Sequence, residues 1–273
     1  MLKTKGLWAE DIDDDDAQVR FIQHVKDTGA NLVCVRTTSP LLRGLIPTFH
    51  QVQIKVFGWM WARVVPNQAD HRYARDEANF VASELIPAGL DGYIFDVESD
   101  DTHPPSAHDW DRTDVEDLTE LATYYSTALQ SAFIARQTPY LLGLTSHARG
   151  FSNYPGIPWK PFLDTCSVLY PQTYWRYNKG ENQNKNCVAE NADPVTHLGA
   201  GTPAQALVNG FKDYNPKRKP IVPIAGEIGC AKPGEMTTFG HLVAQRGLSE
   251  AHFYVDVPNA AIPDGALQEI RAL

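Results

Sequence analysis

The segment DGYIFDVE, residues 91–98, has the alternating pattern of a buried β-strand that ends in acidic side chains. Because successive side chains of a strand point to opposite faces, Ile94, Asp96 and Glu98 share one face of this segment. The residues between them form the other face, which is apolar and suited to packing against helices. The segment therefore predicts a buried strand that carries two carboxylates toward its carboxyl end.

Seven other segments have the same β-branched or aromatic character and predict further strands. They are KGLWAE (5–10), NLVCVR (31–36), IKVFGWMWA (54–62), YLLGLTSH (140–147), SVLYPQTYW (167–175), PIVPIAGE (220–227) and AHFYVDV (251–257). Helical periodicity lies between them, most clearly over 113–136, where Thr113 and Glu116 form a capping box. Three more helices are expected: one from about Asp70 to Ile86 before Gly89, one opening at Thr202-Pro203 and one opening at Lys232-Pro233.

Alternation of eight strands with helices over 273 residues is the pattern of a (β/α)8 TIM barrel, an α/β fold. An open doubly wound sheet is the main alternative. It is disfavoured because the first strand is followed by EDIDDDDAQ (10–18) and not by a glycine-rich phosphate turn. We therefore expect one barrel domain over residues 1–273, with long loops at 99–112 and 176–201.

The charge balance of the chain limits its partners. Lysine and arginine number 24 and aspartate and glutamate 33, which gives a net charge of -9 without a basic block. Neither nucleic acid nor an anionic membrane is an expected partner of such a chain. No run approaches the roughly 18 apolar residues of a membrane span, and the N-terminus lacks the apolar core of a signal peptide, so a cytoplasmic protein is expected.

The four cysteines are too few for a disulfide scaffold. Cys34 and Cys166 lie in or beside apolar runs, where buried free thiols are common. Cys187 and Cys230 lie in loop-like segments that can face each other, and the sequence leaves open whether they form a disulfide.

In a (β/α)8 barrel, the carboxyl ends of the strands and the loops that follow them build the active site. Alternation brings inward-facing polar or aromatic groups from every strand to this end. They are Trp8, Glu10, Arg36, Trp59, Trp61, Asp96, Glu98, Thr145, His147, Tyr170, Gln172, Tyr174, Glu227, Tyr254 and Asp256. A single carboxylate of this kind is often only a surface residue. Burying many polar groups at one place costs free energy, so their convergence here indicates a functional site.

Two carboxylates beside aromatic side chains suit cleavage of a glycosidic bond, in which one acid protonates the leaving oxygen and a second group stabilises or attacks the sugar carbon. Repulsion from Asp96 is expected to raise the pKa of Glu98 and so keep it a proton donor. A carbohydrate substrate is expected, without a cofactor or metal ion. The predicted catalytic residues are Glu98, Asp96 and Glu227, and the predicted substrate-binding residues are Trp8, Arg36, Trp59, Trp61, His147, Gln172, Tyr174, Trp175, Tyr254 and Asp256.

The fourth-strand segment resembles the pattern DGxDxDxE of the chitinase-type glycoside hydrolase family 18. Ile94 departs from that pattern, because it stands where the family has its first inward Asp. The Asp-x-Glu ending is also similar to the lysozyme-like glycoside hydrolase family 25. Over 54–257 the chain resembles uncharacterised TIM-barrel proteins described only as hypothetical glycoside hydrolases, through GWMWARV (58–64), the DGYxxDxE strand and PQTYW (171–175).

The resemblance to family 18 implies roles for three residues. Glu98 would be the general acid, and Asp96 its electrostatic partner or the group that orients a substrate N-acetyl. Tyr174 would hold the acetamido oxygen in a substrate-assisted reaction. For a substrate without an acetamido group, a protein carboxylate has to serve instead, and the candidates are Glu227 and Asp256. Glu10 is set aside because it opens an acidic run of soluble character.

Two other functions remain open. A sugar-binding barrel without hydrolysis is compatible with Ile94, and in it Asp96 and Glu98 would only hydrogen-bond sugar hydroxyls. A metal-dependent hydrolase could use His147, Asp96, Glu98 or Asp256, although the sequence contains no H-x-H or H-E-x-x-H pair. His103 and His108, in the loop after the fourth strand, are expected to be solvated.

Overall fold

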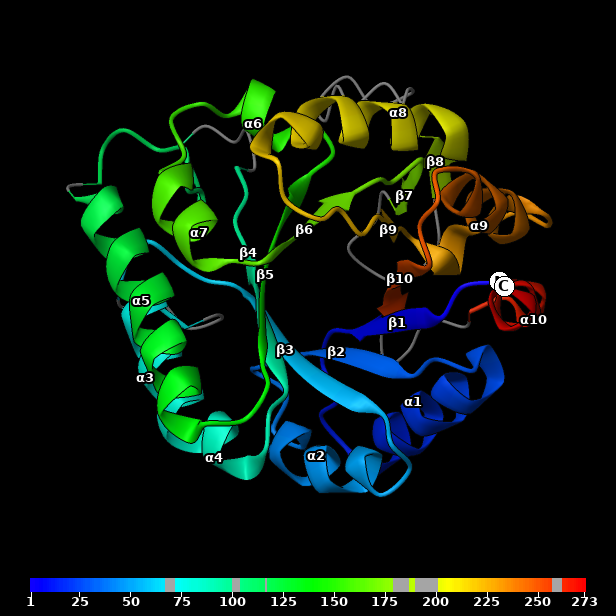
Figure 1. The fold of residues 1–273 in the computed structure, drawn as a ribbon, viewed down its shortest axis with the longest axis horizontal. Helices are drawn as coiled ribbons and strands as arrows, with labels where there is room; N and C mark the ends of the chain where they lie inside the picture. Colours follow the sequence, from blue (N-terminus) through cyan, green and yellow to red (C-terminus); the bar gives the residue numbers. More distant parts are fainter. Residues whose placement is uncertain (67–71, 100–103, 116, 179–186, 190–200, 257–261) are drawn as a thin grey trace.

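The computed structural model describes residues 1–66, 72–99, 104–115, 117–178, 187–189, 201–256 and 262–273. Eight parallel strands close into a barrel that is surrounded by helices (Figure 1). The strands follow one another around the ring in chain order, and the last pairs with the first. They are β1 (Thr4–Ala9), β2 (Leu32–Arg36), β3 (Lys55–Trp61), β4 (Gly92–Asp96), β5 (Leu141–His147), β6 (Val168–Gln172), β9 (Ile224–Ala225) and β10 (Glu250–Asp256). The predicted (β/α)8 TIM barrel is confirmed.

Helices occupy the outside of the barrel between successive strands (Figure 1). They are α1 (Asp15–Thr28), α2 (Leu42–His50), α3 (Ala74–Phe80) with its π-helical continuation (Val81–Leu85) and α4 (Ile86–Ala88), α5 (Leu118–Arg136), α6 (Gly150–Asn153), α7 (Trp159–Thr165), α8 (Pro203–Tyr214), α9 (Glu235–Gln245) and α10 (Asp264–Ala272), with 3-10 turns at Asn215–Lys217 and Ile228–Cys230. A short antiparallel pair, β7 (Arg176–Asn178) and β8 (Cys187–Ala189), lies within the predicted second loop. None of the helices in the described ranges is long and apolar enough to cross a membrane.

Two helices begin later than the sequence predicts. Helix α5 begins at Leu118 rather than at Thr113, because residues 104–115 first fold back onto β3, where the Trp110 indole donates to the Ala62 carbonyl at 3.0 Å. Thr113 therefore caps no helix, and its predicted partner Glu116 lies outside the described residues. Helix α9 begins only after Gly234, whose left-handed backbone (φ 85°) is incompatible with a helix opening at Lys232-Pro233.

The start of α8 and the end of α4 confirm the predicted boundaries. The Thr202 hydroxyl accepts a hydrogen bond from the Gln205 backbone N–H at 3.3 Å, which caps α8. Gly89 follows α4 in the left-handed region, with φ 114°. The expected start of the preceding helix near Asp70 lies outside the described residues, and the helix is described from Ala74.

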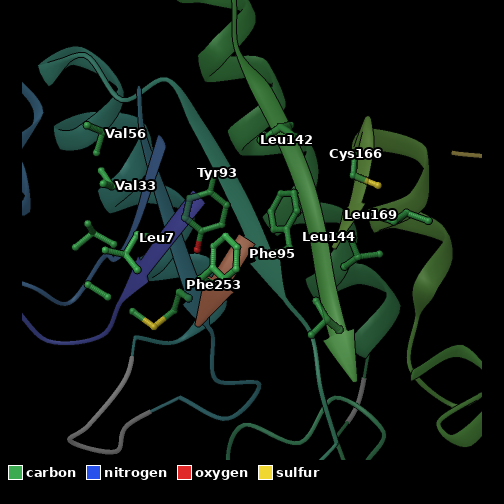
Figure 2. Packing of buried hydrophobic residues seen from close by; sticks show 14 of the residues in the cluster. Leu7, Val33, Val56, Tyr93, Phe95, Leu142, Leu144, Cys166, Leu169 and Phe253 are labelled. Carbon is green, nitrogen blue, oxygen red and sulfur yellow. The ribbon is translucent and has the colours of Figure 1, made fainter. Parts of the chain in front are cut away.

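The hydrophobic core has two layers, one between the strands and the helices and one inside the barrel. Figure 2 shows part of the outer layer, in which Tyr93 and Phe95 of β4 point toward the helices. The inner layer includes Ile94 of the same strand, together with Trp8, Leu32, Cys34, Phe57, Trp59, Tyr170, Val222 and Ile224. The predicted alternation of β4 is therefore confirmed, and it directs Asp96 into the barrel.

A hydrogen-bonded chain crosses the interior of the barrel beneath its mouth. The Trp8 indole donates to His252 Nδ1 at 3.0 Å, so this nitrogen carries no proton. The other ring nitrogen, Nε2, lies 3.1 Å from Glu250 Oε1 and donates to it. Gly6 makes room for the imidazole, because a Cβ at this position would lie 2.5 Å from the His252 ring.

The described cysteines follow the predicted division. Cys34 and Cys166 are free and buried. Burial raises the pKa of Cys166 to about 11 and also raises that of Cys34 well above its usual value, so neither is a reactive thiolate at neutral pH. Cys230 is disulfide-bonded, a state typical of oxidising compartments. The Cys187 side chain, the partner that the sequence left open for Cys230, lies outside the described part of the chain. The cytoplasmic localisation stays a prediction.

A fully buried carboxylate, Glu77 of α3, ties the helical layer to the barrel. It accepts hydrogen bonds from the Thr37 hydroxyl at 2.5 Å, from Arg72 Nη1 at 3.1 Å and from the Tyr93 hydroxyl at 3.0 Å. The Tyr93 hydroxyl also bonds that of Tyr125 on α5. One carboxylate thus joins β4, directly behind the acidic strand end, to two helices and the loop after β2.

We expect Glu77→Ala to lower the free energy of unfolding by about 3 to 5 kcal/mol, because it leaves Arg72 and two buried hydroxyls without their acceptor. Urea denaturation measures this change. Glu84→Ala is the matched control, since Glu84 forms an exposed pair with Arg43 and its loss should cost less than about 1 kcal/mol. Equal losses in the two variants would contradict the role of the buried network.

Candidate active site

Two acidic side chains meet at the mouth of the barrel, at the end of β4. Asp96 is the last residue of the strand and is 6% exposed, and Glu98 follows it on the same face. The side-chain amide of Gln172, from the end of β6, donates to Asp96 Oδ1 at 3.3 Å and also to Glu98 Oε1. The predicted catalytic pair is thus held together by an amide from two strands away.

The environment of the pair shifts the pKa of Asp96. Burial raises the pKa of Asp96 well above its ordinary value, and the charges of Glu98 and then Glu10 raise it further. A raised pKa favours the protonated, neutral form of the Asp96 carboxyl beside Glu98. The sequence predicted that repulsion between the two carboxylates would raise the pKa of Glu98. In the structure, the charge of Glu98 raises the pKa of Asp96, the deeply buried member of the pair.

His147, from the end of β5, forms one side of the acid pair. Its Nε2 lies 2.9 Å from the Ser99 carbonyl oxygen and 3.6 Å from Glu98 Oε2. A carbonyl can only accept, so Nε2 carries a proton and donates it to Ser99. The His147 ring also lies against Tyr154, with 5.4 Å between the ring centres. The predicted strand-end histidine is therefore fixed beside Glu98 by the backbone of the loop after β4.

Two stacked tyrosines form the opposite side of the site. The rings of Tyr174 and Tyr254 lie 5.4 Å apart and 13° from parallel, and the Tyr254 hydroxyl donates to Glu10 Oε1 at 2.6 Å. Burial raises the pKa of Tyr174 well above its usual value, and the charges of Glu98, Asp96 and Glu227 raise it further. Within the described ranges its hydroxyl forms no hydrogen bond. Tyr174 is thus a neutral donor available to a ligand near the acid pair.

The predicted tryptophans lie at different depths. Trp8 and Trp59 are 2% and 3% exposed and pack against each other at 5.4 Å. Each also contacts the Tyr254 ring edge, at 6.2 and 6.1 Å, so both support this tyrosine from below. Trp175 is buried against Phe239 of α9, in the outer layer. Of the predicted tryptophans, Trp61 is the partly exposed one at the mouth, in register with Asp96.

The loop after β4 packs onto the end of β3 and brings His108 to the site. The His108 ring lies 4.9 Å from that of Trp61, and its Nδ1 is 3.2 Å from the Trp61 carbonyl. His108 is 8% exposed, so the prediction of a solvated side chain is wrong. The reason is tertiary, because residues 104–115 are held against β3 and β4 by backbone bonds such as Val64 to Ala107. His103 lies outside the described residues.

The remaining predicted residues complete the rim. Arg36 is paired with Asp11, with Nε 3.0 Å from Oδ1. Glu227 follows β9, and its charge acts on both Tyr174 and Tyr254. The side chain of Asp256 lies outside the described part of the chain. The described residues contain no group of three or more His, Cys, Asp or Glu side chains arranged to hold a metal ion.

Glu10 is the residue that sequence reasoning set aside and the structure brings into the site. It follows β1 directly, accepts the Tyr254 hydrogen bond, and its charge reaches Asp96. Strand alternation alone places Glu10 on the rim, so the two-residue period that located Asp96 also predicts the position of Glu10. The acidic run after it concealed this role, because a run of charges is usually a solvated surface.

No protein-family model matches the sequence, and no match was found among curated proteins. Solved structures do match. They include a family 18 N-acetylglucosaminidase from Paenibacillus barengoltzii (TM-score 0.57, 10% identity, 98% of this chain and 99% of that chain), a family 26 β-mannanase from Bacteroides ovatus (0.55, 12%, 99% and 88%) and a tamarind chitinase-like lectin (0.56, 11%, 97% and 98%). An orotidine 5′-monophosphate decarboxylase and an aldo-keto reductase also match, so the likeness shows the fold alone. The chain is a TIM barrel whose structural neighbours include glycoside hydrolases.

We expect Asp96→Asn to make the protein more stable than the wild type at neutral pH. The folded wild type keeps a proton on Asp96 that the unfolded chain releases above a pKa of about 3.9, so its stability falls as pH rises from there toward the raised folded pKa. Asparagine does not titrate and lacks this loss. Urea denaturation at several pH values should show the advantage of the variant growing with pH above about 4.

Asp164→Asn, which removes an exposed carboxylate from α7, is the control and should show no such trend. A stability difference between Asp96→Asn and the wild type that stays constant with pH would contradict a raised pKa at Asp96.

Proposed function

We propose that this protein is a glycoside hydrolase in which Glu98 is the general acid. The observation that carries the proposal is the Asp96–Glu98 pair, which Gln172 bridges and in which the pKa of Asp96 is raised. Near it lies Tyr174, whose hydroxyl forms no hydrogen bond within the described residues. Hydrolysis of a glycosidic bond needs a proton for the leaving oxygen and a group for the oxocarbenium-like carbon. The likeness to glycoside hydrolases of families 18 and 26 supports the same class at the level of the fold.

In the proposed reaction, the pair holds one proton, and Glu98 delivers it to the glycosidic oxygen as the C–O bond breaks. It is the more exposed member of the pair, with 13% of its side chain accessible. The pair then carries two negative charges, which stabilise the positive charge that develops on the sugar carbon. Glu98 finally accepts a proton from the attacking water, which restores the starting state.

The group that meets the sugar carbon depends on the substrate. An N-acetylated sugar can supply its own acetamido oxygen, and the Tyr174 hydroxyl is the donor available to hold that group. A sugar without an acetamido needs a protein carboxylate, and Glu227 is the candidate among the described residues, because its charge acts on both tyrosines of the site.

A sugar-binding barrel without hydrolysis is the second candidate. It is favoured by Ile94, which is fully buried in the inner core where the family 18 pattern has an inward carboxylate. A chitinase-like lectin is among the structural neighbours, at 11% identity. In this function the two carboxyl groups, Gln172 and Tyr174 hydrogen-bond a glycan, and no bond breaks.

Reducing-end release from a panel of chitin oligomers, peptidoglycan and plain hexose and pentose polymers separates the two functions. We expect wild type to cleave at least one glycan and Glu98→Gln to lose roughly 100- to 10,000-fold in kcat, because the amide cannot donate an acidic proton. The glycan Kd of the variant, measured by calorimetry, should change only a few-fold. Glu120→Gln, an exposed carboxylate of α5, is the control and should match wild type.

Binding without cleavage by wild type would overturn the hydrolase and support the sugar-binding barrel. Cleavage that is unaffected by Glu98→Gln would show that another residue is the acid.

Glu227→Gln distinguishes the two routes to the sugar carbon. On a substrate with an acetamido group, we expect it to retain most of the wild-type kcat, because the substrate supplies the oxygen. On a plain hexose polymer, we expect a loss of roughly 100-fold or more, because a reacting carboxylate is removed. Steady-state kinetics on both substrates measures the contrast, and equal losses on the two would contradict a substrate-dependent role.

A further inference from the structure

Glu10 is held at the mouth of the barrel by contacts from two sides. The hydroxyl of Ser39, a buried residue after β2, donates to the Glu10 backbone carbonyl at 2.7 Å. The Tyr254 hydroxyl donates to the Glu10 carboxylate at 2.6 Å. The first contact fixes the backbone and the second fixes the side chain. Glu10 is therefore an ordered part of the site and not the beginning of a solvated acidic tail.

The pairing of β1 with β10 is irregular at this point. Leu7 pairs with Phe253, but Ala9 pairs with Asp256, so β10 contains one more residue than β1 over this interval. The irregularity lies between Phe253 and Asp256, the interval that contains Tyr254. Bulges of this kind turn a side chain away from the direction that a regular strand would give it, and they are frequent at barrel rims. Here the irregularity accompanies a tyrosine that reaches back to the end of β1.

Tyr254 in turn fixes Tyr174. Their rings are stacked at 5.4 Å, and Tyr174 is confined on its other side by Gly226, where a Cβ would collide with the Tyr174 ring. Tyr174 therefore has little freedom to move, and Tyr254 is the neighbour that limits it on the side of β10.

We propose that Glu10 is a positioning residue: it anchors Tyr254 and thereby holds the Tyr174 hydroxyl beside the Asp96–Glu98 pair. This inference rests on the proposed function, because it assigns to Tyr174 the contact with the sugar. Glu10 acts through Tyr254 and does not itself react. Small misplacements of a group that contacts the substrate lower rates steeply, so Glu10 affects the reaction although Tyr254 and Tyr174 lie between it and the sugar.

The charge of Glu10 provides an independent readout. It contributes to the raised pKa of Asp96 and to that of Tyr254. Removing the charge while keeping the hydrogen-bond acceptor should therefore lower the pKa of the acid pair without releasing Tyr254. The activity of a general acid is lost as pH rises through its pKa, so the basic limb of the pH profile should move to lower pH.

The test compares Glu10→Ala, Glu10→Gln, Tyr254→Phe and the double variant Glu10→Ala/Tyr254→Phe, with Glu120→Gln as a control for loss of one carboxylate. Glu10→Ala and Tyr254→Phe break the same hydrogen bond, so each should lower kcat by roughly 10- to 100-fold, and the double variant should lose no more than either single variant. Glu10→Gln keeps an acceptor for Tyr254 and should recover most of the lost rate, with the basic limb shifted to lower pH.

Crystal structures of wild type and Glu10→Ala give a readout that does not depend on turnover. We expect Tyr174 and Tyr254 to separate in the variant beyond their 5.4 Å centroid distance. If Glu10→Ala fails to fold, Tyr254→Phe tests the same hydrogen bond. A wild type that cleaves no glycan overturns the proposed function, whereas the separation of the tyrosines still tests the anchor.

Three results would overturn the positioning role. Tyr174 could keep its place in Glu10→Ala, the losses of the two single variants could add in the double variant, or Glu10→Gln could be as impaired as Glu10→Ala. The last result would mean that Glu10 acts through its charge as a reacting carboxylate.

Discussion

Closure of eight parallel strands into a ring brings the last inward residue of each strand into the same small volume. In this protein that volume receives Asp96 from β4, Gln172 from β6 and Tyr254 from β10. Two carboxyl groups crowded together away from water cannot both be ionised without a large cost. The amide of Gln172 and the raised pKa of Asp96, which favours the neutral form of that carboxyl, offset that cost.

The layer of side chains below the mouth holds the residues of the site in place. Large rings fill the interior of the barrel, and they fit because glycines face them: Gly6 opposite His252, and Gly226 opposite Tyr174. The Trp8 indole is bonded to a histidine that is itself bonded to Glu250, so the ring that supports Tyr254 is fixed from beneath. The packing and hydrogen bonds of the barrel interior thus hold Tyr254, and with it the stacked Tyr174, in place.

The outer side of β4 is held just as firmly. Tyr93, an outward residue of β4, bonds both Glu77 and Tyr125, so the strand that presents the acid pair is joined to α3 and α5. Loss of one partner of a buried carboxylate with three donors strongly destabilises the fold. The contact between the helical layer and the barrel therefore depends on Glu77. The acidic strand therefore sits between two polar networks, one inside the barrel and one outside.

The sequence by itself determined the eight strands, the two faces of β4 and the place of Asp96 and Glu98, because these follow from a local two-residue period that needs no distant partner. It also located Tyr174 and Gln172 at the correct ends of their strands. Only the tertiary structure decided that Gln172 bridges the acid pair, that Glu10 anchors Tyr254, that His108 is buried, and that α5 starts at Leu118. Each of these depends on contacts between residues far apart in the chain, and the period of a single strand or helix contains no information about which distant side chain fills the space beside it.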